Sequence, residues 1–440
     1  MASTTPAIHR PREADTNRRV CVIGAGFSGL GVAQALQRDG MAFDLVEATG
    51  AVGGNWSHGV YDSSHLISSK RSTAYREYPM PREWATFAPR ENMREYFNSY
   101  ADHFGLRDHI EFDKEVARLE PLGVEGGDGW TVDFVDGESR TYDAVVVANG
   151  HDWSPHVPTY PGTFTGEQLH SKQYFRPGDV KGERVLVVGA GNSAVDIAVE
   201  LSATRQVDTS MRRTYWFLPK TIGGIPTAEL DRWYIPEWLQ RPMMKLALRI
   251  HPGPMSRYGL PAPKHDMFAT SPTVNETFLA ALSHGDLRYR PGIERLDGDT
   301  VHFADGTSGQ YDTIVWGTGF HVDFPFLDEK YVPRGDDGKP VLAARMVPAN
   351  DLRNLYMFGV IFPRTGGGPL ISRAGPVLAG AIRWQWMVDY PISRKVGIIQ
   401  KPTSQMTIGA GHLTRRLWIG RRYVALRLRL ARFRRPRRSA

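Results

Sequence analysis

The chain has 440 residues, of which 41% are hydrophobic and 23% are charged. These proportions are typical of a globular protein with two or three hydrophobic cores, and they exclude a fibrous, repeat or intrinsically disordered chain. A single cysteine, Cys21, excludes an internal disulfide, so the fold needs no oxidising compartment. No apolar run reaches the roughly 18 residues of a membrane-spanning helix. We expect the polar residues 1–17 to form a disordered leader and the protein to be cytoplasmic.

The net charge of +7 is concentrated at one end of the chain. After Asp389 there are fourteen basic residues and no acidic residue, which leaves 40 basic and 47 acidic residues elsewhere, a net charge of −7. Nucleic-acid binding would require a basic face on a globular domain, whereas this charge belongs to a terminal segment. We therefore expect no nucleic-acid partner.

The first predicted element is a strand over residues 19–23, which runs into the turn Gly24-Ala25-Gly26-Phe27-Ser28-Gly29 and a helix. In such a unit the first glycine permits a tight turn, the second lets a pyrophosphate approach the backbone, and the third packs helix against strand. The helix N-terminus then presents free amides to the anion. A second strand, residues 43–46, ends in Glu47, whose carboxylate can accept hydrogen bonds from a ribose diol. The unit predicts a site for the adenosine half of FAD or NAD.

The same order of elements recurs from residue 184, where a strand over 184–188 runs into Gly189-Ala190-Gly191-Asn192-Ser193-Ala194. The following helix has Ala194, Ile197, Ala198 and Leu201 at i, i+3, i+4 and i+7, which predicts one buried face. In place of Glu47, this copy has Arg212-Arg213-Thr214. A guanidinium there can pair with a 2′-phosphate in bidentate fashion, so we expect NADPH; a solvated surface charge is the alternative.

Both copies also continue in the same way. Each passes through an Asp-Gly turn typical of a β-hairpin, at 136–137 and 305–306, and each ends in a strand, at 142–150 and 311–319. The first glycine precedes the tyrosine of that strand by 118 residues in one copy and by 122 in the other. An isolated βα turn would not produce this pairing. The sequence therefore predicts an α/β fold with two Rossmann-like dinucleotide-binding domains.

Between the two copies lies a further motif, formed by Phe164, Gly166, His170 and Tyr174. It resembles the identifying motif of the class B flavin-dependent monooxygenases, F-x-G-x-x-x-H-x-x-x-Y, in every position. Baeyer-Villiger relatives generally end this motif in tryptophan, whereas Tyr174-Phe175 is similar to the heteroatom-oxygenating flavin-containing monooxygenases. The resemblance covers about residues 18–370 and extends to further elements: Gly53-Gly54-Asn55-Trp56, Gly150-His151, Ser271 to Glu276, and Gly317-Thr318-Gly319-Phe320.

The resemblance implies an FAD domain interrupted by an NADPH domain. We expect residues 18–163 and 322–412 to form the first, and residues 164–321, with a helical insertion, to form the second. The residues expected to bind FAD are Gly24, Gly26, Phe27, Ser28, Gly29, Glu47, Asn55, Trp56, Ala148 and Gly150. Those expected to bind NADPH are Gly189, Gly191, Asn192, Ser193, Ala194, Arg212, Arg213, Thr214 and Gly319.

The chemistry that the resemblance implies belongs to the cofactors. NADPH passes a hydride to the flavin, the reduced flavin captures O2 as a C4a-(hydro)peroxide, and nitrogen or sulfur of a small lipophilic substrate takes the distal oxygen. Amines, sulfides and ketones are the candidate substrates, and no metal is expected. Three alternatives stay open: Baeyer-Villiger oxygenation of a ketone, a non-oxygenating NADPH oxidase or reductase, and a binding protein that holds nucleotides without turnover.

One position departs from the family pattern. Many heteroatom-oxygenating relatives carry an asparagine at the flavin within T-N-x-x-K, and alignment on Lys70 puts Ile67 at that position. Isoleucine makes no side-chain hydrogen bond. Ser68 or His65 would take over, backbone amides would suffice, or the oxygenated flavin would be short-lived; His65 as a packing residue is the alternative. We expect Asn275 to line the cleft, and His170 to position the two domains.

The basic segment, residues 413–440, has an apolar stripe at spacings of four and three residues. This pattern is typical of an amphipathic helix on an anionic membrane surface, and packing on the acidic body of the protein is the alternative. Peripheral membrane contact through this segment and a homodimer both stay open. The stripe consists of Ile419, Tyr423, Leu426, Leu430 and Phe433.

Overall fold

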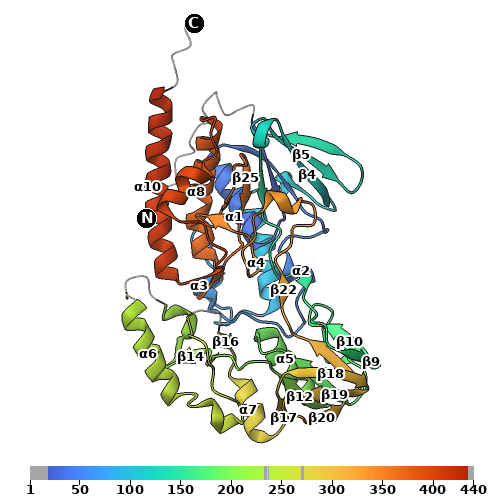
Figure 1. The fold of residues 1–440 in the computed structure, drawn as a ribbon. Coiled ribbons are helices and arrows are strands. Elements are labelled where there is room, and N and C mark those ends of the chain that lie inside the picture. The colour runs from blue at the N-terminus through green and yellow to red at the C-terminus, as the bar shows by residue number, and fades with distance from the viewer. Residues whose placement is uncertain (1–17, 232–234, 236, 269–271, 435–440) are drawn as a thin grey trace.

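The structure is a computed structural model that describes residues 18–231, 235, 237–268 and 272–434. The predicted disordered leader, residues 1–17, lies outside the described residues, as do residues 435–440 of the basic segment. Two five-stranded parallel sheets organise the chain, one in the upper and one in the lower half of Figure 1. This arrangement confirms the predicted α/β fold class.

The first sheet has the strand order β25-β7-β1-β2-β3, and every neighbouring pair is parallel. All four residues of β7 are buried, as expected for an apolar strand covered on both faces. Strand β25 joins this sheet only after the chain has completed the second one. The strands are β1 (Arg19–Ile23), β2 (Ala42–Val46), β3 (Ile110–Glu111), β7 (Ala144–Val147) and β25 (Leu355–Met357).

The second sheet has the order β10-β21-β11-β12-β17 and repeats the parallel arrangement. In both sheets the strand before the glycine turn, β1 or β11, lies between two parallel neighbours. The crevice at the carboxyl end of such a strand is where open α/β sheets bind ligands. The strands are β10 (Glu167–His170), β11 (Arg184–Val188), β12 (Gln206–Ser210), β17 (Leu287–Arg290) and β21 (Thr313–Trp316).

Smaller sheets surround these two. The predicted Asp-Gly turns connect antiparallel strands, β5 to β6 and β19 to β20, as expected for β-hairpins. The three-stranded sheet consists of β4 (Val116–Leu122), β5 (Gly129–Phe134) and β6 (Ser139–Tyr142). The four-stranded sheet consists of β9 (Gly162–Phe164), β18 (Ile293–Gly298), β19 (Thr300–Phe303) and β20 (Ser308–Gln310). The two-residue strands are β8 (Ser154–Pro155), β13 (Phe217–Leu218), β14 (Thr221–Ile222), β15 (Ile225–Pro226), β16 (Thr273–Val274), β22 (Phe320–His321), β23 (Leu342–Ala343), β24 (Val347–Pro348), β26 (Phe362–Pro363) and β27 (Thr407–Ile408).

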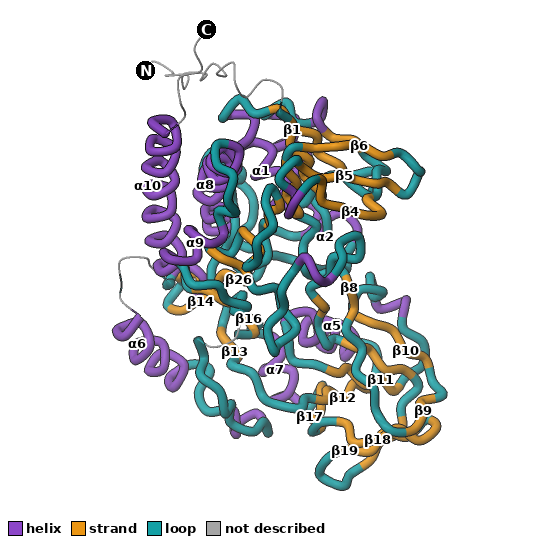
Figure 2. The backbone as a smooth tube through the Cα atoms, turned by 45° about the horizontal axis from the view of Figure 1, so that its top comes forward, coloured by secondary structure: helices purple, strands orange, loops and turns teal. Residues whose placement is uncertain are grey.

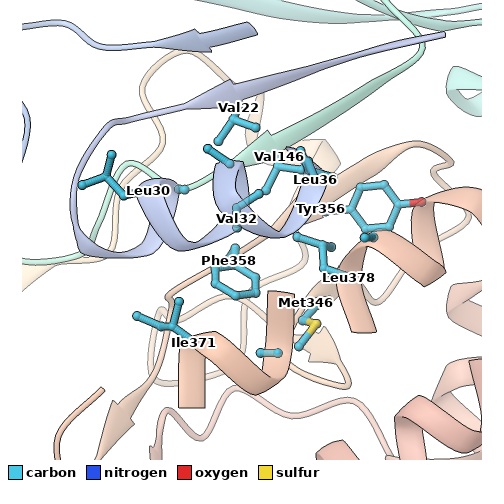
Figure 3. Packing of buried hydrophobic residues seen from close by; sticks show 14 of the residues in the cluster. Val22, Leu30, Val32, Leu36, Val146, Met346, Tyr356, Phe358, Ile371 and Leu378 are labelled. Carbon is cyan, nitrogen blue, oxygen red and sulfur yellow. The ribbon is translucent and has the colours of Figure 1, made fainter. Parts of the chain in front are cut away.

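The largest core lies between the first sheet and the helices α1 and α8, where Val22 and Val146 of the sheet approach Leu36 and Leu378 of the helices (Figure 3). The helices approach closely because Gly375 faces Ala35, where an added Cβ would lie only 2.7 Å from the Ala35 Cβ. The helices are α1 (Phe27–Arg38), α2 (Asn55–His58), α3 (Lys70–Thr73), α4 (Arg90–His103), α5 (Asn192–Ser202), α6 (Glu237–Ile250), α7 (Thr277–His284), α8 (Gly368–Trp386), α9 (Ser393–Ile399) and α10 (Ala410–Arg434).

The basic segment forms α10, which packs along α8 (Figure 2). The buried face of α10 is not the predicted stripe: it consists of Leu413, Leu417, Val424 and Ala431, and Val424 fits against Gly380 of α8. Of the stripe, Tyr423 packs on Trp384, whereas Ile419, Leu426 and Leu430 are exposed, and the Phe433 side chain lies outside the described residues. The helix is apolar on two faces, so its periodicity alone did not identify the packed one. Among the described helices, none is long and apolar enough to cross a bilayer.

Candidate functional site

The first glycine loop connects β1 to α1 in the geometry that a pyrophosphate site requires. Gly24 has φ +101°, and a Cβ there would lie 2.8 Å from the Ala148 carbonyl oxygen at the end of β7. At Gly29 an added Cβ would lie 1.7 Å from the Gly24 oxygen, so any side chain would push α1 away from the turn. Both glycines are required by the backbone, and the N-terminus of α1 is left facing the crevice.

The second loop reproduces this geometry. Gly189 has φ +129°, and a Cβ there would meet the Gly317 carbonyl oxygen at 2.2 Å, after β21. At Gly191 no atom lies within 4 Å of an added Cβ, so the space in front of this residue is open. An open backbone at the start of α5, beside its free amides, fits the approach of a second pyrophosphate.

A single cavity of about 1560 Å³ reaches both loops and the segment after Gly54. Its walls come from both halves of the molecule, and α6 contributes Met243, Met244 and Ala247. The predicted residues that line it are Gly24, Gly26, Phe27, Ser28, Glu47, Asn55, Trp56, His65, Ile67, Ser68, Ala148, Gly150, Gly191, Asn192, Ser193, Ala194, Arg213 and Gly319.

Other predicted residues lie behind this wall. Gly29 and Gly189 pack helix against strand, as the third and first glycines of their loops. Arg212 and Thr214 flank Arg213 without lining the cavity. The motif residues Phe164, Gly166, His170 and Tyr174 also lie outside the wall, whereas Ser171 and Lys172, within the same motif, belong to it.

Glu47 follows β2 and is 7% exposed. One carboxylate oxygen accepts from the Ala25 amide at 2.7 Å, and the other accepts from the Thr49 amide and hydroxyl at 3.0 and 2.8 Å. A carboxylate has about four acceptor positions, so one remains free. The glycine loop therefore orients Glu47 at the cavity wall with capacity for one further donor, which fits a ribose hydroxyl.

Arg213 lies three residues beyond the end of β12 and lines the cavity. Its side chain is exposed, and the guanidinium lies 5.2 Å from the centre of the Tyr215 ring. Next to it, the Thr214 hydroxyl is buried and has no hydrogen-bond partner among the described residues. An accessible guanidinium held by an aromatic ring beside an unused hydroxyl fits a phosphate-bearing ribose.

The segment around Ile67, where the sequence departs from the family pattern, forms part of the cavity wall. Ile67 is 36% exposed, and its side chain offers no hydrogen bond. The Ser68 hydroxyl is paired with the Thr73 hydroxyl at 2.6 Å. His65 Nδ1 donates to the Ser63 carbonyl oxygen at 3.2 Å, and Nε2 accepts from the Lys220 ammonium. Both polar neighbours of Ile67 are therefore engaged by the protein, and Lys220 was not among the predicted site residues.

The structure corrects the place predicted for Asn275. This residue is 3% exposed and does not line the cavity. Its amide donates to Asp196 at 2.5 Å, and its carbonyl oxygen accepts from the Phe278 amide at 2.7 Å, in the first turn of α7. Asp196 also accepts from the Tyr61 hydroxyl at 2.7 Å. Asn275 both donates and accepts hydrogen bonds inside the fold, so its side chain has a structural role at this position.

His170 ends β10 with both ring nitrogens engaged by the backbone. Nε2 donates to the Gly319 carbonyl oxygen at 3.0 Å, and Nδ1 accepts from the Lys172 amide at 3.1 Å. Burial lowers the pKa of His170, so the neutral ring is favoured. Tyr174 is fully buried and donates to Glu200 at 2.7 Å. These contacts suit a role of His170 in positioning Gly319, between β21 and β22, rather than a role in proton transfer.

Sequence reasoning missed several charged residues of the wall. The Lys172 ammonium donates to the Asn55 side-chain oxygen at 2.8 Å, and burial lowers the pKa of Lys172. Arg364 pairs with Asp231 at 3.4 Å, which joins the segment after β26 to the helical insertion. Lys172 could have been found from its place in the motif, whereas Arg364 carries no sequence signal. Within the described residues, no group of three His, Cys, Asp or Glu side chains is arranged to hold a metal ion.

Comparisons with known proteins agree with this geometry. A profile described as "FMO-like: Flavin-binding monooxygenase-like" matches residues 17–372. A rat protein named dimethylaniline monooxygenase [N-oxide-forming] 2 is 30% identical over 374 residues, which cover 79% of this chain and 70% of that protein.

Two solved structures share the fold at lower identity. S-allyl-L-cysteine S-oxygenase from Allium sativum has a TM-score of 0.65 and 21% identity, with 96% of this chain and 94% of that one covered. An open crystal structure of cyclohexanone monooxygenase has a TM-score of 0.66 and 19% identity, with 94% and 98% covered. Since the profile spans most of the chain, the chain belongs to the flavin-binding monooxygenase-like family.

Proposed function

We propose that this chain is an FAD- and NADPH-dependent monooxygenase that oxygenates nitrogen or sulfur in small lipophilic substrates. The observation that carries the proposal is the single cavity onto which both helix N-termini open, with a carboxylate at one nucleotide loop and a guanidinium at the other. When bound, NADPH supplies a hydride and the flavin supplies activated oxygen.

The protein's own residues bind and orient these groups. The amides at the start of α1 hold the FAD pyrophosphate, and Glu47 accepts from the adenosine ribose. The amides at the start of α5 hold the NADPH pyrophosphate, and Arg213 pairs with the 2′-phosphate. Trp56, Ile67 and the apolar side chains of α6 exclude water from the space between the nucleotides.

The choice of nitrogen or sulfur over a ketone rests on Tyr174. Its hydroxyl bonds to Glu200 and its ring packs on Tyr61 at 6.2 Å, so the motif ends in a buried polar contact that tryptophan would not reproduce in the same way. The solved neighbours include both an S-oxygenase and a cyclohexanone monooxygenase, so the fold alone is compatible with either reaction.

The experiment that tests this proposal is product analysis with the FAD-loaded protein and NADPH. The probes are N,N-dimethylaniline, methyl phenyl sulfide and cyclohexanone, each followed by mass spectrometry together with NADPH and hydrogen peroxide. We expect the N-oxide and the sulfoxide. Lactone as the main product would establish ketone oxygenation instead, and NADPH consumption with peroxide as the sole product would overturn the proposal.

A second candidate function is a non-oxygenating NADPH oxidase. The observation that favours it is Ile67, which leaves the segment 65–68 of the wall without a free side-chain donor because Ser68 and His65 are engaged elsewhere. Oxygen activated on the flavin would then leave as hydrogen peroxide. The same product analysis distinguishes this candidate, because it predicts peroxide in amounts equal to the NADPH consumed with every probe.

We further propose that the enzyme works against an anionic lipid surface, with α6 and α10 as the contact. Both figures of the whole chain show these helices along one edge of the molecule (Figures 1 and 2). On α6, Trp238, Leu246 and Ile250 are 74%, 61% and 74% exposed. On α10, exposed arginines recur every seven residues, and none forms an ion pair within the described chain. These arginines are Arg415, Arg422 and Arg429.

Vesicle co-sedimentation tests this contact. We expect binding to phosphatidylcholine vesicles that contain phosphatidylglycerol, little binding to pure phosphatidylcholine, and loss of binding as salt rises. Arg422→Glu and Leu246→Glu should each weaken it. Absence of binding at low salt would refute the contact, and salt-insensitive self-association that both variants abolish would assign these faces to a homodimer.

A further inference from the structure

Arg345 occupies an unusual backbone position at the cavity wall. It lies in the turn between β23 and β24, where the Met346 amide donates to the Ala343 carbonyl oxygen at 3.1 Å. The two residues inside this turn, Ala344 and Arg345, have φ of +47° and +59°. Turns of this kind favour Asn-Gly, because side chains are disfavoured in the left-handed region. The chain thus keeps an arginine where glycine would be less strained.

The Arg345 side chain is buried and lacks an acidic partner. Arg345 is 8% exposed and lines the cavity. One terminal nitrogen donates to the Gln405 carbonyl oxygen, whereas Nε is buried without any acceptor. Among the described residues, no carboxylate lies within ion-pair distance of this guanidinium. A guanidinium has five N–H donors, and the Gln405 carbonyl oxygen satisfies one of them here. Burial of such a cation is unfavourable unless a further acceptor binds to it.

The surroundings add positive charge and apolar surface. Burial and the neighbouring Arg416 of α10 lower the pKa of Arg345 to about 10, which leaves the guanidinium protonated at neutral pH. Arg364, which follows β26, lines the same cavity and is matched by Asp231. Apolar side chains of neighbouring segments also line the cavity, among them Met346, Phe362, Leu413 and Leu417.

Arg345 belongs to neither of the two predicted pyrophosphate loops. The pyrophosphate loops are at the starts of α1 and α5, and no hydrogen bond joins Arg345 to either loop in the described chain. We propose that Arg345 binds the carboxylate of a lipophilic substrate acid, and that the amine or sulfide to be oxygenated lies elsewhere in the same molecule. This inference rests on the proposed function for the oxygenation step alone.

The test is equilibrium binding to the oxidised, FAD-loaded protein, which requires no turnover. The probes are 4-(methylthio)benzoate and its methyl ester, which differ in the carboxylate charge. We expect the acid to bind more tightly to the unchanged protein. Arg345→Gln should raise the Kd of the acid about 30-fold or more and leave the Kd of the ester within about 2-fold. Arg345→Lys should restore part of the affinity for the acid.

Two further variants control for folding and for nonspecific charge. Arg345→Asn removes the charge with a residue that tolerates the left-handed backbone, so it should fold even if Arg345→Gln does not. Arg373→Gln removes a half-buried arginine that does not line this cavity, and we expect no change with either probe.

Equal affinity of the unchanged protein for the acid and the ester would overturn the proposal. So would an equal loss of affinity for both probes in Arg345→Asn. Loss of FAD from that variant would also overturn it, because it would assign Arg345 to the cofactor. Preference for the acid in binding, without oxygenated product from either probe, would leave the anion site intact and refute the proposed function. Sulfoxidation of both probes without preference for the acid would support the proposed function and refute the anion site at Arg345.

Discussion

Replacement of Arg213 by alanine should weaken binding of NADPH far more than binding of NADH. Only NADPH carries a 2′-phosphate, and Arg213, which follows β12, is the one of the two adjacent arginines that lines the cavity. A hydrogen bond to a charged group contributes about 1.5–3 kcal/mol, and the exposure of Arg213 places it toward the lower end. A loss of about 1.5 kcal/mol raises the KM for NADPH about 10-fold.

The assay is steady-state NADPH oxidation at fixed probe and oxygen concentrations, repeated with NADH. Arg212→Ala is the matched control, because it removes the same charge from an exposed neighbour that does not line the cavity. We expect Arg212→Ala to change the KM for NADPH less than about 2-fold. Equal increases of KM for NADPH and NADH in Arg213→Ala, or equal effects of both variants on NADPH, would refute the role assigned to Arg213.

Three further predictions concern the cavity wall and the contacts behind it. Ile67→Asn adds a hydrogen-bond donor at the wall and should lengthen the transient between reduced and reoxidised flavin in stopped-flow absorbance; an unchanged decay would mean that this position does not touch the flavin. Asn275→Ala removes the contacts to Asp196 and α7, so it should lower the free energy of unfolding by about 1–2 kcal/mol in urea while the KM for NADPH stays unchanged; a change confined to KM would return Asn275 to the site. Because burial depresses the pKa of His170, the unfolded chain takes up this proton first, and stability should fall as pH drops below about 6.5. Urea unfolding at pH 7.5 and 5.5 should show a smaller loss in His170→Gln than in the unchanged protein, and equal losses would show that His170 does not carry this dependence.

The elements that sequence analysis predicted well are those with strong local patterns. Strand β7 is a run of apolar residues that is buried throughout, and the helix face of α5 with Ala194, Ile197 and Leu201 is buried as its period predicts. The glycine loops could be predicted equally well, because the backbone conformations of Gly24 and Gly189 exclude side chains and therefore require glycine in the sequence. Local chemistry therefore specified the nucleotide loops.

The remaining features depend on contacts between distant segments. Asn275 follows a motif strand, but its side chain turns toward Asp196 and α7, a direction that the motif alone does not contain. Helix α10 has apolar residues on two faces, and only the close approach at Gly380 selects the one that packs. Arg345 lies in the turn between β23 and β24 without any motif, and only the fold shows that it is buried with its guanidinium against the Gln405 carbonyl oxygen. Each of these requires the tertiary structure.

The decisive step of the proposed function is the transfer of an oxygen atom from O2 to nitrogen or sulfur of a substrate at this cavity. The most direct measurement is oxidation of methyl phenyl sulfide by the FAD-loaded protein with NADPH under ¹⁸O2, with the product analysed by mass spectrometry. We expect a sulfoxide that carries one ¹⁸O atom, with one NADPH consumed for each molecule formed. Unlabelled sulfoxide, or labelled hydrogen peroxide formed in place of sulfoxide, would refute the transfer of oxygen from O2.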